Sequence, residues 1–111
     1  MNMSEVIYNK LIRDKIPEII AADDAEAVVR TLEPEEYKRA LLEKLVEEAQ
    51  ELLESGGSLD ERVDVEEVLR ALDEVYSIDK PSLEAARLHK ALARGAFTKR
   101  LYLEKTIQSD S

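Results

Sequence analysis

The sequence contains no cysteine, and His89 is its only histidine. Without thiols the chain can form neither disulfides nor a zinc site built from thiolates. One imidazole excludes a metal site made of several histidines, and it argues against a catalytic triad in which histidine activates a nucleophile. A metal ion would therefore have to be bound through oxygen atoms.

Positive charge is also scarce. The chain has 16 Lys and Arg against 25 Asp and Glu, a net charge of −9. This balance argues against passive electrostatic binding to nucleic acid or to an anionic membrane, so neither is an expected partner. No apolar run approaches the roughly 18–20 residues that span a bilayer. The N-terminus lacks a basic region followed by an apolar core and a cleavage site, so we expect a cytoplasmic protein.

The residues that are present indicate a folded protein. Hydrophobic residues make up 44% of the chain and charged residues 37%, a composition typical of globular proteins rather than disordered ones. A length of 111 residues predicts one domain, residues 1–111. A domain of this size buries a limited core, so association with further copies of the chain would stabilise it.

Apolar periodicity predicts a mainly α-helical fold with about four helices. The first helix contains Pro17 in its first turn, where the missing N–H of proline is not needed. A long helix opens at residues 33–36 and ends at the sequence Ser55-Gly56-Gly57-Ser58. A third helix is predicted for about residues 59–77, and a fourth from an N-cap at Ser82 through Arg94, ended by Gly95.

Short apolar stretches outside the helices predict extended structure. Residues 6–8 and 27–32 are rich in β-branched side chains, which favours a small two-stranded element near the N-terminus. Such a ribbon needs support from the helices to persist. Residues 96–107 carry Phe97, Leu101, Tyr102 and Ile107 and are expected to pack against the body as a strand or extended segment.

Two pairs of carboxylates flank the Gly-Gly turn. They are Glu48 with Glu51 before it, and Glu61 with Asp64 after it. Residues three apart lie on the same side of a helix, so two helices packed antiparallel would bring both pairs together. Four carboxylates in one place favour Mg²⁺ or Mn²⁺ over zinc, and a cation would relieve their mutual repulsion.

A helical wheel ranks these acids by how close they lie to the apolar stripe of their helix, because a charged residue on that stripe is not expected at a solvent-exposed surface. Asp64 lies within the apolar stripe of its helix, Glu61 lies near the middle of that stripe, and Glu48 borders the stripe of the preceding helix. Glu51 lies further round. Each has a structural alternative: a capping box of Ser58 with Glu61, an ion pair of Glu48 with Lys44, and an ion pair of Asp64 with Lys or Arg.

These motifs together resemble the MazG-type all-α nucleoside triphosphate pyrophosphatases. The paired carboxylates have the form ExxE followed by ExxD. The opening YNKLIRDKIPEII and the closing RGAFTKRLYLEK are similar to the small MazG-like, phosphoribosyl-ATP-pyrophosphohydrolase-like proteins, so the resemblance runs from about residue 8 to residue 105.

The resemblance implies a MazG-like helical bundle that hydrolyses a nucleotide to its monophosphate and pyrophosphate in a housekeeping role. It implies Mg²⁺ or Mn²⁺ as cofactor, with Glu48, Glu51, Glu61 and Asp64 as catalytic metal ligands. It also implies a homodimer or higher homo-oligomer. The basic residues of the opening and closing blocks become candidate contacts to the phosphates of the nucleotide: Lys10, Arg13, Lys15, Lys99 and Arg100. From charge alone, Lys10, Arg13 and Lys15 would belong to a solvated loop with salt bridges.

Two departures from the family pattern bear on activity. Only nine residues separate Glu51 from Glu61, and Arg62 and Glu66 replace residues expected to be apolar. Both are compatible with altered substrate choice or weak activity. The alternative hypothesis is therefore a non-catalytic nucleotide- or protein-binding module that retains the MazG-like fold.

Overall fold

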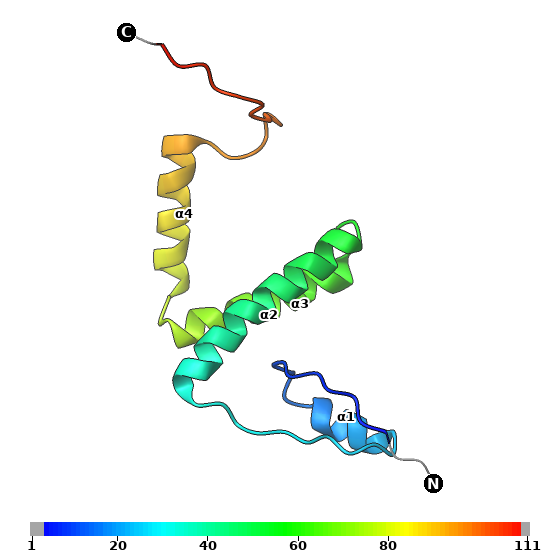
Figure 1. The fold of residues 1–111 in the computed structure, drawn as a ribbon. Helices are drawn as coiled ribbons and strands as arrows, with labels where there is room; N and C mark the ends of the chain where they lie inside the picture. The colour runs from blue at the N-terminus through cyan, green and yellow to red at the C-terminus, as the bar shows by residue number, and fades with distance from the viewer. Residues whose placement is uncertain (1–3, 110–111) are drawn as a thin grey trace. The chain divides into compact units, whose positions relative to one another are not determined.

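A computed structural model describes residues 4–109 of the chain. Within that range the secondary structure is helical, with α1 (Ile16–Ala22), α2 (Pro34–Glu54), α3 (Leu59–Val75) and α4 (Lys80–Arg94) (Figure 1). The prediction of a mainly α-helical fold with four helices is confirmed. The chain forms two units, Met1–Ser77 and Ile78–Ser111. No helix in the described residues is both long and apolar enough to cross a membrane.

The start of α2 is fixed by its first residues. Pro34 occupies the first turn, where its missing N–H costs nothing. Glu33 and Glu36 form a reciprocal capping box, in which each side chain accepts a hydrogen bond from the backbone of the other residue. The negative charges at this end also interact favourably with the helix dipole. The helix therefore begins where the sequence predicts.

Glycine determines the turn between α2 and α3. Gly56 and Gly57 both have positive φ, +72° and +93°, a region that side-chain-bearing residues adopt only with strain. Their N–H groups donate to the carbonyls of Leu53 and Leu52, which ends α2. Ser58 then caps α3, since its Oγ accepts a hydrogen bond from the Glu61 N–H at 3.3 Å. One of the two bonds of the expected capping box is thus present.

The short turn makes α2 and α3 an antiparallel hairpin whose helices lie side by side (Figure 1). Its core contains Leu41 from α2 and Val68 and Leu72 from α3. Each of these side chains contributes roughly 1.5–3 kcal/mol when fully buried. Partly buried neighbours complete the cluster: Leu11, Tyr37, Leu45, Ala71 and Val75. Leu11 brings the segment before α1 into contact with the hairpin.

The two-stranded element predicted for residues 6–8 and 27–32 is wrong. Neither stretch forms a strand in the described chain, and most of their apolar side chains are exposed, Val28 to 91%. A ribbon of two short strands is marginal unless another element covers one of its faces. Here no such face is covered, so β-branched composition alone does not produce pairing.

Two other expectations need correction. The N-cap of α4 is Asp79 rather than Ser82, because the Asp79 carboxylate accepts hydrogen bonds from the Ser82 N–H at 2.8 Å and Oγ at 2.9 Å. Helix α3 ends at Val75, two residues early, and Ser77 has a positive φ of 53°. In the unit Ile78–Ser111, residues 96–107 form no strand and run as an extended segment, one of the two forms expected, with Phe97 97% exposed.

Candidate metal centre

Glu48 is the one buried charged residue in the described chain, with 7% of its surface exposed. One carboxylate oxygen, Oε1, lies 3.4 Å from Lys44 Nζ on the preceding turn of α2. The other, Oε2, is buried and has no hydrogen-bond partner. Leaving such an atom unpaired costs about 1–3 kcal/mol, and more when the group is charged. A buried, half-satisfied carboxylate therefore needs an explanation.

Three carboxylates meet at this position. One oxygen each from Glu48 and Glu51 of α2 and from Glu61 of α3 lie within 4.8 Å of one another. Glu61 Oε2 is also buried without a partner. We call these three residues the acid cluster. Their convergence follows from the three-residue spacing on α2 and from the tight turn that places the first turn of α3 beside the last turns of α2.

The electrostatics of the acid cluster disfavour its charged form. Burial raises the pKa of Glu48, the neighbouring Glu51 adds to the rise, and Lys44 opposes it. Burial also raises the pKa of Glu61, followed by the charges of Asp64, Asp60 and Glu48. Both shifts have the causes expected for carboxylates crowded together away from water. A cation among them would offset this cost.

Asp64 belongs to a second group that shares Glu61. Oxygens of Asp60, Glu61 and Asp64 lie within 4.8 Å of one another. The structure thus brings three of the four predicted ligands into one group and connects the fourth through Glu61. Asp60 was not among the predicted ligands, although its position four residues before Asp64 puts the two on one side of α3.

The ranking of the acids differs from the helical wheel. Glu48 is the most buried of them, whereas the Asp64 side chain is 34% exposed and forms an ion pair with Arg13, with 2.7 Å between Nη2 and Oδ1. Glu51 is partly buried rather than on the outer surface. A wheel drawn for one helix cannot include a residue from a distant segment such as Arg13, nor the rotation of the neighbouring helix. The structural alternatives noted for Glu48 and Asp64 are both present as contacts.

Two of the five predicted basic residues lie at the hairpin. Lys10 Nζ contacts Glu47 Oε1 at 3.0 Å, and Arg13 contacts Asp64. Lys15 is exposed at the N-cap of α1. Lys99 and Arg100 lie in the unit Ile78–Ser111, in the exposed segment after α4.

The donor set suits a hard divalent cation. All four predicted ligands offer carboxylate oxygens, and the unpaired oxygens of Glu48 and Glu61 are available to coordinate. Mg²⁺ binds through one or two carboxylates while keeping several waters, and Mn²⁺ accepts similar ligands. With no sulfur and no imidazole in the group, the site does not suit zinc.

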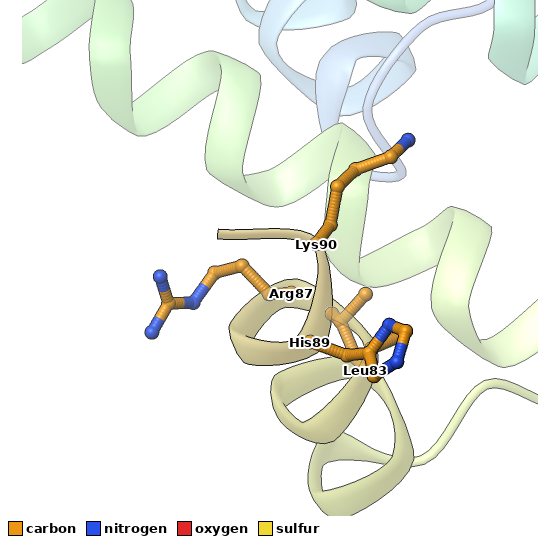
Figure 2. Close-up of a pocket in the computed structure, with 5 residues that line it drawn as sticks. Leu83, Arg87, His89 and Lys90 are labelled. Carbon is orange, nitrogen blue, oxygen red and sulfur yellow. The ribbon is translucent and has the colours of Figure 1, made fainter. Parts of the chain in front are cut away.

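A shallow hollow on α4 offers no comparable constellation. It is lined by Leu83, Ala86, Arg87, His89 and Lys90, all from this helix. In Figure 2 the side chains of Arg87 and Lys90 extend away from each other, and Arg87 pairs with Glu84 on its own helix. Since no polar groups converge there, the hairpin remains the better candidate.

Comparison with known proteins adds one partial match. A 43-residue segment is 51% identical to an uncharacterised protein of Mycolicibacterium smegmatis, covering 39% of this chain and 44% of that protein. No family model matches the chain. No solved structure matches it either.

Proposed function

We propose that the chain is a metal-dependent nucleoside triphosphate pyrophosphohydrolase of the MazG-like type. It would bind Mg²⁺ or Mn²⁺ through Glu48, Glu51, Glu61 and Asp64 and release pyrophosphate from canonical or damaged nucleotides. The observation that carries the proposal is the buried Glu48 carboxylate, which has an unpaired oxygen and belongs to a group of three converging carboxylates. The ExxE and ExxD motifs and the opening and closing blocks support the same assignment.

The chemistry requires an activated water and neutralised phosphates. Water attacks the α-phosphorus, the bond from that phosphorus to the bridging oxygen breaks, and pyrophosphate leaves. A carboxylate of the group would orient the water and accept its proton. A bound cation supplies charge neutralisation and lowers the pKa of coordinated water. Lys10 and Arg13, held at the hairpin, would offset the charge that develops on the leaving pyrophosphate.

We further propose that the enzyme is a homodimer or higher homo-oligomer. The hairpin buries three hydrophobic residues, while Leu42, Val46, Leu53 and Val63 on its helices remain largely exposed. Exposed apolar side chains that gather in a patch often mark a contact with another protein chain. Equilibrium sedimentation tests this directly, and a monomer at micromolar concentrations would contradict it.

The test of function is pyrophosphate release from a panel of ribo- and deoxyribonucleoside triphosphates with Mg²⁺ or Mn²⁺. Turnover of at least one nucleotide is expected, and Glu48→Gln and Asp64→Ala should abolish it. Glu54→Gln is the matched control, because Glu54 lies one turn after Glu51 on α2 but is exposed and bonded to Gln50. No turnover with either metal would contradict the proposal. Metal-dependent nucleotide binding without hydrolysis would favour the binding module.

A further inference from the structure

A short basic segment is attached to both helices of the hairpin. We call residues 10–13 the lead-in. Lys10 pairs with Glu47 of α2 at 3.0 Å, and Arg13 pairs with Asp64 of α3 at 2.7 Å. Between them, Leu11 packs against the core of Leu41, Val68 and Leu72. Two ion pairs and one apolar contact therefore fix the position of the lead-in on the hairpin.

The two ion pairs differ in whether their acidic partner is a candidate metal ligand. Glu47 belongs to neither carboxylate group, so Lys10 occupies no candidate ligand. Asp64 does belong to one, and Arg13 occupies its Oδ1. A divalent cation held by Asp64 would sit close to the guanidinium, and the two positive charges would repel each other. Arg13 and a cation thus compete for the same carboxylate.

We propose that Arg13 is a displaceable counter-ion of the metal site, and that it transfers from Asp64 to a phosphate of the ligand when a cation binds. This inference rests on the proposed function, because it requires a cation at the carboxylates. Arg13 would be a positioning residue in the cation-free protein and a phosphate contact in the loaded one.

The exposure of the pair makes this exchange inexpensive. The side chains of Arg13 and Asp64 are 53% and 34% exposed, so water screens their attraction. Lys10 and Leu11 keep the backbone of the lead-in in place while the Arg13 side chain turns. A guanidinium offers several N–H donors in a planar fork that matches phosphate oxygens, which a lysine at this position could not reproduce.

Calorimetric titration of the full chain separates the two roles of Arg13. Mn²⁺ is titrated alone, and inorganic pyrophosphate is then titrated into the Mn²⁺-loaded protein. Arg13→Gln should bind Mn²⁺ about two- to fivefold more tightly than wild type, the worth of an exposed ion pair. The same variant should bind pyrophosphate about tenfold more weakly, the worth of a charge-assisted hydrogen bond.

Two further variants serve as controls. Arg62→Gln removes the same charge from α3, where Arg62 pairs with Glu66 outside both carboxylate groups, and should alter neither affinity by more than about twofold. Arg13→Lys keeps the charge but loses the fork, so it should bind Mn²⁺ as wild type does and pyrophosphate more weakly. Circular dichroism checks that every variant remains helical.

The outcomes distinguish this inference from the proposed function. Equal Mn²⁺ affinities for Arg13→Gln and Arg62→Gln, with binding still lost in Glu48→Gln, would overturn the role of Arg13 and leave the metal site intact. Weaker Mn²⁺ binding by Arg13→Gln would also overturn it. If Arg13→Gln behaves as expected but no nucleotide is hydrolysed, the counter-ion role is supported and the enzymatic function fails. If neither the wild type nor any variant binds Mn²⁺, both the counter-ion role and the proposed function fail.

Discussion

Helices α2, α3 and α4 are all amphipathic, but the hairpin of α2 and α3 differs from α4 in how many side chains it buries. The hairpin buries Leu41, Val68 and Leu72 and encloses a carboxylate. Helix α4 buries none of its residues, and Leu83, Leu88 and Leu92 remain exposed. Its order comes from local features instead: the Asp79 cap, a Pro in the first turn and the pair between Glu84 and Arg87.

The difference shows what apolar periodicity can and cannot specify. A repeating apolar stripe identifies the side of a helix that needs covering, and a four-residue turn with two glycines supplies a partner helix immediately. After α4 no such turn follows, so the stripe has no partner set by local sequence. Residues 78–111 contain only four acidic residues: Asp79, Glu84, Glu104 and Asp110. Most of the negative charge of the chain therefore lies in the unit Met1–Ser77, which contains the hairpin.

The largest predicted effect tests this contrast in packing. Leu72→Ala should lower the free energy of unfolding by about 2–5 kcal/mol, because Leu72 is 8% exposed and its truncation leaves a cavity. Leu92→Ala should change it by less than about 0.5 kcal/mol, because Leu92 is 88% exposed. Urea denaturation measures both. A large cost for Leu92→Ala that grows with protein concentration would indicate that a second copy covers α4.

The second prediction concerns the effect of metal on the hairpin. Mg²⁺ or Mn²⁺ at one hundred times its Kd should stabilise the native state by about 2.7 kcal/mol, because only the folded chain brings the carboxylates together. Thermal unfolding with and without metal measures this. Glu48→Gln should abolish the stabilisation and Glu54→Gln should retain it. An unchanged melting temperature in the wild type would argue for a plain helical interaction protein without a metal site.

The third prediction follows from the raised pKa of Glu48. The folded state binds this proton more tightly than the unfolded state, whose Glu pKa is near 4.5. The stability from the bound proton is complete below pH 4.5 and is lost as pH rises through the folded pKa. Without metal, Glu48→Gln should therefore match wild type in acid and be about 1–2 kcal/mol more stable at neutral pH.

Glu47, the neighbour of Glu48 on α2, has a pKa shifted in the opposite direction and should show the opposite pH dependence. Burial tends to raise the pKa of Glu47, but Lys10 and Lys44 together outweigh it and hold that pKa below its ordinary value. The stability due to Glu47 is therefore present above pH 4.5 and is lost as pH falls through its folded pKa. Glu47→Gln should thus lose stability at neutral pH. Chemical denaturation at a series of pH values checks both variants, with Glu43→Gln at an exposed position of α2 as control. A pH-independent difference between Glu48→Gln and wild type would contradict the argument.

Sequence reasoning recovered the features that depend on neighbouring residues. Glu33, Pro34, Gly56 and Gly57 set the ends of α2, and the three-residue spacing brought Glu48 and Glu51 to one side. It failed where distant parts of the chain decide. Asp64 forms an ion pair with Arg13, which lies 51 residues earlier in the chain, and no periodicity in α3 predicts this contact. Residues 27–32 have strand-like composition but no pairing partner. The role of the four acids as metal ligands stays a prediction.

The smallest predicted effect compares the two helix caps, Ser58 and Asp79. Each accepts a hydrogen bond from the N–H three residues on, at 3.3 Å in α3 and 2.8 Å in α4. Removing either cap with alanine should cost about 1 kcal/mol, but in different places. In Ser58→Ala the cost should appear in global unfolding, because α3 shares the hairpin core.

In Asp79→Ala the cost should appear as faster hydrogen exchange of the α4 amides alone, since α4 buries none of its own side chains and depends on its local cap. Amide exchange followed by NMR distinguishes the two patterns residue by residue. Asp79→Asn is the conservative control, because its side-chain oxygen can still accept the hydrogen bond from Ser82. If Asp79→Ala accelerates exchange throughout α2 and α3 as well, then α4 is energetically coupled to the hairpin and the contrast between the two regions does not hold.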